Sequence, residues 1–229
     1  MSALQTLWQY TSEMTISRSP LVGQQMVRSQ IIKTEKTMTT NPWSFTITVA
    51  PIPWPTFRAI GEDLNQITRL TPETITVGST TTPWLFRYQG DLSSTPTGLQ
   101  VASFANNVMV LENLPTMPST SALLRSGDFL QISGFPYLYT AVTDVLRGSG
   151  TTVNVTVHRP NIITSSITGG TGVNVGNNCQ ISLIVTTLPD YKITPGAAQI
   201  ASNGTVINNG FVTFDKPITL TEYTYQSGS

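Results

Sequence analysis

The sequence contains few of the side chains that catalysis and metal binding require. Its 229 residues include one histidine, one cysteine, 12 basic and 12 acidic side chains. A single cysteine excludes an intrachain disulfide framework, and no Cys/His cluster has the spacing of a zinc site. We therefore expect no metal and no cofactor. A structural or binding protein fits this composition better than an enzyme.

Strong charge and long hydrophobic runs are also missing. The formal net charge is zero, so the chain has no field that would attract nucleic acid or anionic lipid. No stretch approaches the roughly 20 apolar residues of a membrane span, and the first ten residues lack the features of a secretory signal. We expect a protein made in a cytoplasm and soluble there, with neither nucleic acid nor membrane as a partner.

What the sequence has is a series of short β-patterned runs. In Trp43–Val49 apolar residues alternate with serine and threonine, and Cys179, Ile181, Leu183 and Val185 share one face of a second strand. Asn209-Gly210, between 205–208 and 211–215, is the strongest hairpin signal in the chain. Short strands joined by tight turns predict a mostly β fold with antiparallel pairing.

One segment has helical periodicity. Phe57, Ile60, Leu64 and Ile67 form a single apolar stripe, and Pro55 suits the first position of a helix. The pattern predicts one helix over residues 55–68. Gly61 weakens it by up to about 1 kcal/mol relative to alanine, so we expect packing against a sheet to stabilise it.

Individual residues give little sign of catalysis. His158 lies opposite the valines of its predicted strand, which is typical of a surface or interface side chain, and Cys179 reads as an inert core thiol. Asp128 follows a glycine at a strand start, where aspartate often binds its own backbone. The spacing of Asp128, Asp144, Asp215 and Glu222 marks no catalytic pair.

Aromatic residues are the remaining candidates for a binding surface. Trp43 and Trp54 fit a buried face and a strand-to-helix junction, whereas Phe135, Pro136 and Tyr137 fall on a predicted turn. Exposed aromatic side chains at a turn usually contact a partner. We therefore predict a partner contact at Phe135, Pro136 and Tyr137.

The residues from Leu124 to Pro160 resemble a module of phage tail proteins. Gly127-Asp-Phe-Leu-Gln-Ile132 is followed by Tyr139-Thr-Ala-Val-Thr-Asp-Val145 and the glycine-rich Gly148-Ser-Gly-Thr-Thr-Val153. Upstream, Ser17-Arg-Ser-Pro20, Asn41-Pro-Trp-Ser-Phe45 and the proline-led helix also fit. The chain is similar to virion structural proteins of T4-like phages that infect cyanobacteria. More distantly, it resembles distal tail and minor tail proteins of long-tailed phages.

The resemblance implies a fold, a location and partners. Residues 1–85 and 175–229 would form a discontinuous, split β-barrel-like domain with one packed helix. Residues 86–174 would form an inserted small antiparallel barrel or sandwich. The expected function is a non-enzymatic structural component of the virion, in a phage tail or baseplate. It would form a ring of copies, six-fold in preference to three-fold, and contact other tail proteins.

Two other functions stay open from the sequence. A carbohydrate-binding adsorption module would present two or three exposed aromatic residues on one flat sheet face, with Trp84 and Tyr137 as the residues to test, or bound calcium near acidic turns. A glycan-degrading enzyme would place two carboxylates roughly 5 to 10 Å apart across a groove.

Overall fold

A computed structural model describes residues 2–18, 22–26, 32–36, 42–67, 71–77, 86–163, 167, 169–196, 198–200, 206–208 and 210–224. The fold is mostly β, with curled antiparallel sheets that include a half-barrel, as expected.

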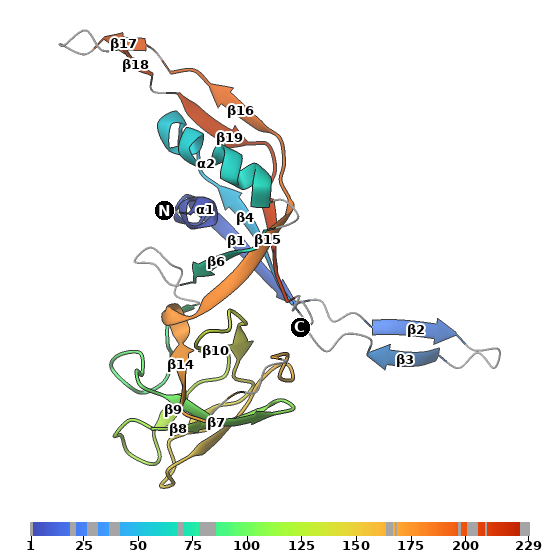
Figure 1. Ribbon diagram of the computed structural model, residues 1–229, viewed down its shortest axis with the longest axis vertical. Coiled ribbons are helices and arrows are strands. Elements are labelled where there is room, and N and C mark those ends of the chain that lie inside the picture. The colour runs from blue at the N-terminus through green and yellow to red at the C-terminus, as the bar shows by residue number, and fades with distance from the viewer. Residues whose placement is uncertain are drawn as a thin grey trace. The chain divides into compact units, whose positions relative to one another are not determined.

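The chain divides into two compact units (Figure 1). The first contains 1–17, 43–75 and 182–223, and the second contains 18–42, 76–181 and 224–229. Relative to the predicted insertion of 86–174, the second unit also includes 18–42, 76–85, 175–181 and the last residues.

The first unit is built on a five-stranded sheet. Its strands, in spatial order, are β1 (Thr11–Arg18), β4 (Trp43–Val49), β20 (Ile218–Glu222), β15 (Gln180–Thr187) and β6 (Glu73–Thr76). The alternation predicted for β4 is confirmed, because Trp43, Phe45 and Ile47 are buried and the residues between them are less so. Antiparallel pairing sets Phe45 opposite Leu220, so the apolar faces of the two strands coincide.

Two α-helices, not one, occur in the described part of the chain. The predicted helix is present as α2 (Trp54–Ile67), but residues 3–9 form a second helix, α1 (Ala3–Gln9). The Ser2 hydroxyl caps α1 by accepting a hydrogen bond from the backbone nitrogen of Gln5. Leu4, Leu7 and Trp8 then share one buried face, because residues three and four apart lie on the same side of a helix. Neither helix is long and apolar enough to span a membrane.

Helix α2 packs on a second sheet of the first unit, as its apolar stripe predicted. This sheet has the order β16 (Tyr191–Thr194), β19 (Phe211–Phe214) and β5 (Ile52–Pro53). The ring of Phe57 lies 4.8 Å from that of Tyr191 and 6.1 Å from that of Phe214, centroid to centroid. Aromatic contacts at such distances stabilise the docking of the helix.

The hairpin predicted at Asn209-Gly210 is wrong. Strand β18 (Val206–Asn208) pairs with β17 (Ala198–Ile200), while β19 pairs with β16, so the strands on either side of this dipeptide do not pair with each other. Strands β18 and β19 therefore do not form a hairpin with each other; their partners are two earlier strands. Asn209 itself lies outside the described residues.

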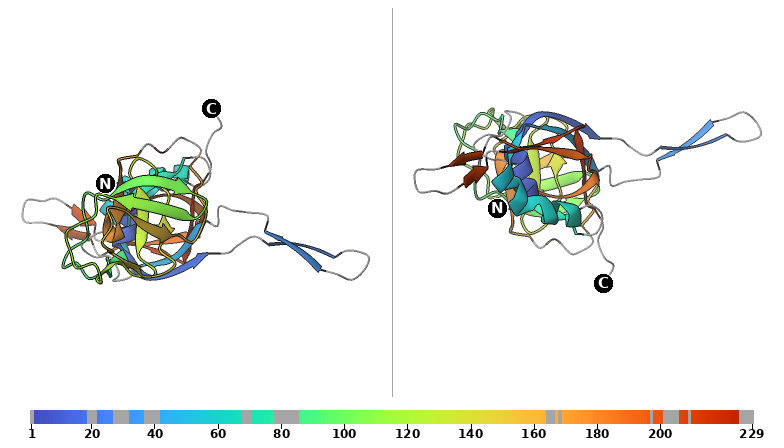
Figure 2. Two further views of the ribbon diagram at one scale, coloured as in Figure 1. Left: turned by 90° about the horizontal axis from the view of Figure 1, so that it is seen from below. Right: turned by 90° about the horizontal axis from the view of Figure 1, so that it is seen from above.

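The second unit contains a six-stranded sheet. Its order is β11 (Tyr139–Thr140), β10 (Phe129–Ile132), β14 (Thr171–Val175), β7 (Gln100–Ala105), β8 (Val108–Glu112) and β13 (Val153–Thr156). Figure 2 shows β7 and β8 side by side, as predicted for a hairpin. Its turn places Asn106 at φ 51°, a conformation that asparagine tolerates. The core of this unit includes Val101, Leu111, Leu130 and Val155.

Two short pairings complete the second unit. Strand β12 (Val145–Leu146) pairs with β9 (Ala122–Leu124), and β13 pairs with β8. The segments on either side of the glycine-rich residues 147–150 are joined by an antiparallel bridge between Ala141 and Val157. The backbone nitrogen of Val142 also donates to the carbonyl of Thr156 at 2.9 Å. Strands β2 (Val22–Met26) and β3 (Ile32–Lys36) form a two-stranded sheet of their own. A single-turn 3₁₀ helix, η2 (Gly176–Asn178), follows β14.

Candidate functional site

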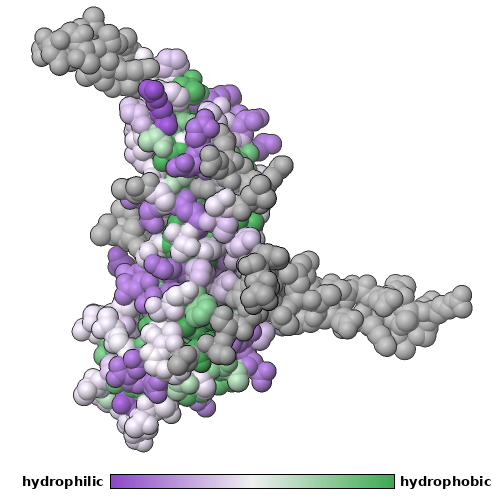
Figure 3. Space-filling view, in the orientation of Figure 1, coloured by the Kyte–Doolittle hydropathy of each residue, from purple (hydrophilic) through white to green (hydrophobic). Residues whose placement is uncertain are grey.

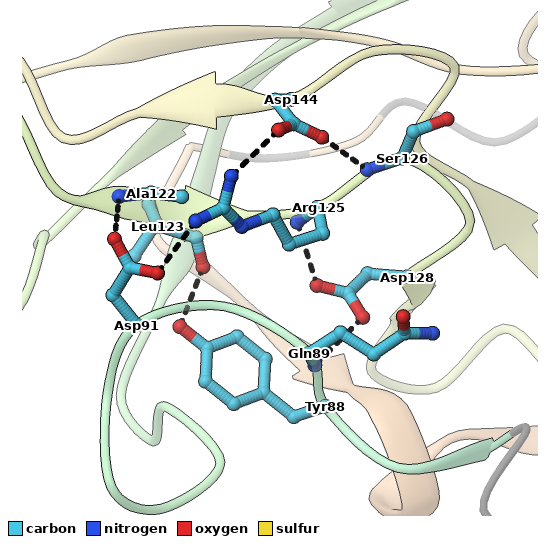
Figure 4. Close-up of polar contacts among 9 residues, drawn as sticks. All are labelled: Tyr88, Gln89, Asp91, Ala122, Leu123, Arg125, Ser126, Asp128 and Asp144. Carbon is cyan, nitrogen blue, oxygen red and sulfur yellow. Dashed lines mark hydrogen bonds and ion pairs between the residues drawn. The ribbon is translucent and has the colours of Figure 1, made fainter.

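The loop of residues 86–98 is held against β9 and the turn that follows it. The Tyr88 hydroxyl donates to the carbonyl oxygen of Leu123 at 2.7 Å (Figure 4). The backbone nitrogen of Asp91 donates to the carbonyl of Ala122 at 2.9 Å, and the nitrogen of Ala122 donates to the Asp91 carboxylate at 2.7 Å. A loop fixed at several points presents its side chains in defined positions, which is how binding loops are commonly built.

Arg125 bridges two carboxylates beside this loop. Its guanidinium donates to Asp91 and to Asp144, each at 2.8 Å (Figure 4). Hydrogen bonds from the backbone nitrogens of Ala122 and Ser126, together with Arg125, lower the pKa of Asp91 and Asp144 respectively. Both carboxylates are therefore ionised at neutral pH. The three side chains are exposed, so their ion pairs add little stability but fix the geometry of the loop.

The buried Asp128 side chain links the 86–98 loop to the turn that follows β9. Its two carboxylate oxygens accept hydrogen bonds from the backbone nitrogens of Arg125, at 2.8 Å, and Gln89, at 2.9 Å. The bond to Arg125 confirms that Asp128 binds its own turn, as its position after Gly127 predicted. Burial raises the pKa of Asp128, because removal from water disfavours the charged form.

This cluster is not arranged for hydrolysis by two carboxylates. Such hydrolysis needs one protonated acid and one ionised base or nucleophile facing an open space. Here Arg125 occupies the space between Asp91 and Asp144, and both carboxylates have lowered pKa values. Asp128 has a raised pKa, but both of its oxygens are bonded to the backbone. The geometry therefore indicates a scaffold for the 86–98 loop.

Residues of this loop also line a polar cavity of about 230 Å³ that is open to solvent. It is lined by Arg87, Tyr88, Leu92, Ser93, Ser94, Thr95 and Asn177. Thr95 Oγ1 donates to Asn177 Oδ1 at 3.3 Å, which connects the loop to η2. The lining residues thus offer one guanidinium, three hydroxyls and one amide. Nothing in the sequence pattern of the Ser93-Ser94-Thr95 run predicts this cavity, because Asn177 joins it only through the fold.

The only histidine of the chain is not a surface side chain. His158 is half-buried with its Nε2 atom shielded from solvent, and its Nδ1 accepts a hydrogen bond from the backbone nitrogen of Thr140 at 3.0 Å. Burial, and then the nearby charges of Arg159 and Arg18, lower its pKa to about 2. A neutral ring that accepts a hydrogen bond at Nδ1 carries its proton on Nε2. His158 therefore joins β11 to the segment after β13 and has the wrong pKa for a general base near pH 7.

Cys179 has a structural role as well. Cys179 is buried, as predicted, and burial raises its thiol pKa well above the usual value. A buried thiol with a raised pKa is a poor nucleophile. Within the described ranges, no group of three or more histidine, cysteine, aspartate or glutamate side chains is placed to hold a metal ion.

The predicted contact at Phe135, Pro136 and Tyr137 follows a turn at Ser133-Gly134, but Tyr137 is only 7% exposed and belongs to the core. Phe135 and Pro136 are half-buried. The exposure on which the prediction depended is therefore absent at Tyr137. Partner binding by Phe135 and Pro136 stays a prediction. Of the two residues named for sugar stacking, Tyr137 is buried, and Trp84 lies outside the described residues.

Comparison with known proteins yields no relative: no protein-family model and no curated protein sequence matches this chain. Its function has to be argued from its own residues.

Proposed function

We propose that this protein is a non-enzymatic structural component of a phage tail or baseplate. It assembles into a closed ring of copies, with six as the predicted number, and contacts other tail proteins in the virion. The sequence resemblance between Leu124 and Pro160 supports the phage context. The observation that carries the assembly is an exposed apolar edge strand in the first unit.

Strand β16 is that edge. It is the outer strand of its three-stranded sheet, and all four of its side chains are exposed. Tyr191 is 42% and Ile193 48% exposed, and Phe211 on the neighbouring strand is 46% exposed. Among the described residues, these are three of the five large hydrophobic side chains that are exposed. An edge with apolar side chains is a template for pairing with a strand of another chain.

The register of the sheet favours strand addition over sugar stacking. Tyr191 lies opposite Phe214, and Ile193 opposite Val212, so these side chains share one face. Phe211 lies opposite Thr194, which places it on the other face. The exposed aromatic residues Tyr191 and Phe211 therefore point to opposite sides and form no flat platform. A strand from a second copy would instead pair with the backbone of the outer strand β16, beside the exposed side chain of Ile193.

Two hairpins also suit an assembly. Strands β2 and β3 form one two-stranded sheet and β17 and β18 another. An isolated two-stranded hairpin is marginally stable in water and usually gains stability by packing on something else. Contacts with neighbouring subunits would provide that packing.

The face of the described residues that Figure 3 shows has no single large apolar area. In Figure 3 the described surface mixes hydrophilic and intermediate residues, and the hydrophobic areas on this face are small. The zero net charge of the chain keeps repulsion between copies weak. Assembly through strand edges, which relies on main-chain hydrogen bonds, fits such a surface better than assembly through a single apolar face.

Self-association of the purified chain tests this proposal. Sedimentation velocity over a range of concentrations should reveal a closed oligomer, and Ile193→Lys should shift it to the monomer. Leu146→Lys is a matched control, because Leu146 is 53% exposed but lies in the second unit. The ring proposal is wrong if the wild-type chain is a monomer at every concentration and occurs singly in the particle.

Phe135 offers a separate test of contact with other tail proteins. Phe135→Ser should weaken binding to a neighbouring component. Because Phe135 is half-buried and packs against the core of the second unit, urea denaturation of the variant must accompany the binding measurement, and only a folded variant tests the contact. Tyr137→Ala is unsuitable for this purpose. It would remove a core side chain, which costs about 3–5 kcal/mol for large aromatic residues.

A further inference from the structure

We propose that the cavity beside the 86–98 loop binds one small hydroxylated ligand that carries an oxyanion, such as the carboxylate of a sugar acid. The cavity lies within the second unit. This inference does not rest on assembly of the chain, and a failure of either proposal leaves the other intact.

The size of the cavity limits the ligand. Its volume is about 230 Å³, below the roughly 300–1,000 Å³ of pockets that hold drug-sized molecules. A water molecule takes about 30 Å³ of liquid volume, so the cavity has room for several waters or for one ring of monosaccharide size. An oligosaccharide would fit only with most of its length outside.

The charge of the lining selects an anion. Arg87 supplies a guanidinium, and no acidic side chain is among the described residues that line the cavity. The acidic residue of the 86–98 loop is Asp91. Its carboxylate accepts hydrogen bonds from the backbone nitrogen of Ala122 and from the guanidinium of Arg125. A guanidinium presents two parallel donors that match the two oxygens of a carboxylate or phosphate.

The other lining groups suit hydroxyls. Ser93 and Ser94 carry hydroxyls that both donate and accept. Thr95 Oγ1 donates to Asn177 Oδ1, so Thr95 offers a ligand its oxygen lone pairs and Asn177 offers the donors of its Nδ2. The ring of Tyr88 and the side chain of Leu92 supply apolar contact. A few polar groups converging on a partly apolar wall are typical of small-molecule sites.

The walls of the cavity are fixed before any ligand binds. Tyr88 and Asp91 are hydrogen-bonded to β9, and the Arg125 cluster holds Asp91 from its other side. The backbone of Gly176, the residue before Asn177, packs against that of Tyr88 and Phe86. A preformed site avoids the entropy cost of ordering a loop on binding.

Titration of the full chain, followed by heteronuclear NMR, tests the inference. Glucuronate and glucose 6-phosphate should shift the amide signals of residues 87–95 and 177, whereas glucose at the same concentration should not. Arg87→Gln should weaken glucuronate binding by about tenfold or more, and Ser94→Ala by a few-fold. Arg58→Gln is the matched control, because Arg58 is exposed on α2 in the first unit and its loss should leave affinity unchanged.

Each other result overturns a defined part of the inference. If glucose binds as tightly as glucuronate, or if Arg87→Gln keeps full affinity while folded, the anion requirement is wrong. If acetate and inorganic phosphate bind as tightly as the sugar acids, the hydroxyl contacts are wrong. If none of the probes shifts these amide signals at millimolar concentration, the cavity is not a ligand site.

Discussion

The backbone of Gly176 packs directly on that of Tyr88. A Cβ atom at Gly176 would lie 2.8 Å from the backbone nitrogen of Tyr88, and Gly176 has a φ of 58°. Glycine is therefore required here twice, once for its left-handed conformation and once for the close approach. This contact sets the distance between η2 and the loop that lines the cavity.

We predict that Gly176→Ala destabilises the second unit more than an alanine at a similar backbone conformation elsewhere. Gly148 is the control, since its φ is 61° and nothing lies within 4 Å of the added Cβ. Gly148→Ala should cost about 1–2 kcal/mol for the left-handed conformation alone. Gly176→Ala should cost about 1–3 kcal/mol more because of the collision. Chemical denaturation of both variants measures the difference, and equal losses would contradict the structural account.

Asp128 should make stability depend on pH in the acidic range. Its folded pKa is raised above the usual 3.8, so just above pH 3.8 the folded chain binds more protons at this site than the unfolded chain does. The contribution of Asp128 to the unfolding free energy therefore falls as pH rises from 3.8 through its folded pKa.

Asp128→Asn isolates this contribution. The variant should lose about 1–3 kcal/mol, because an amide cannot accept both backbone hydrogen bonds. It should also lack the fall in stability that the wild type shows on deprotonation of Asp128. The difference between the two pH profiles, measured by urea denaturation, is the test. Parallel profiles would show that Asp128 has an ordinary pKa.

Local patterns in the sequence predicted much of the fold. The apolar alternation in β4 and the apolar stripe on α2 were sufficient to predict these two elements. In each of them a single buried face makes apolar residues recur at a regular spacing along the sequence. The N-terminal helix has such a stripe too, in Leu4, Leu7 and Trp8. The sequence did not predict this helix, because a segment of seven residues is too short for its periodicity to stand out.

Pairing between strands was harder to predict than the strands themselves. The Asn209-Gly210 dipeptide is a strong turn signal, yet β18 and β19 each pair with a strand that precedes it. Turn propensity is a local preference, and the pairing of a longer hairpin overrides it. The segments on either side of the glycine-rich residues 147–150 do pair, but only around Ala141 and Val157, because β12 pairs with β9.

The candidate cavity could not be read from the sequence at all. Arg87 and the Ser93-Ser94-Thr95 run are near in sequence, but Asn177 reaches them only through the fold. The Arg125 cluster likewise brings together Asp91 and Asp144, which lie 34 and 19 residues from Arg125 in the chain. Such groupings have no periodic signature, so only the tertiary structure reveals them.

His158 should remain neutral throughout the physiological range. Its pKa of about 2 predicts that the ring signals of this single histidine do not titrate between pH 5 and 8 in NMR spectra of the folded protein. Protonation at Nδ1 would remove the hydrogen bond from Thr140. A midpoint near the ordinary value of 6.5 would show that the ring is accessible to water.

The same group makes a second, thermodynamic prediction. Because the folded pKa lies below the unfolded one, the unfolded chain binds the extra proton between about pH 2 and 6.5. The stability from His158 is therefore complete above pH 6.5 and is lost as pH falls below it, by up to about 1.4 kcal/mol per pH unit. His158→Asn should remove this slope, which is opposite in sign to that of Asp128. A profile that keeps the wild-type slope would assign it to other groups.

Helix α1 should behave as part of the core of the first unit and not as a dispensable arm. Leu7 is fully buried, and the neighbouring Trp8 makes an edge-to-face contact with Phe45, with ring centroids 5.6 Å apart. The backbone nitrogen of Leu4 also donates to the Glu73 carboxylate at 3.1 Å.

We predict that Leu7→Ala lowers the unfolding free energy by about 2–5 kcal/mol, as expected for a large-to-small change in a packed core. Gln9→Ala, on the exposed face of the same helix, should change it by less than about 0.5 kcal/mol. Urea denaturation of both variants decides the matter: similar small losses would mean that α1 is not docked in solution.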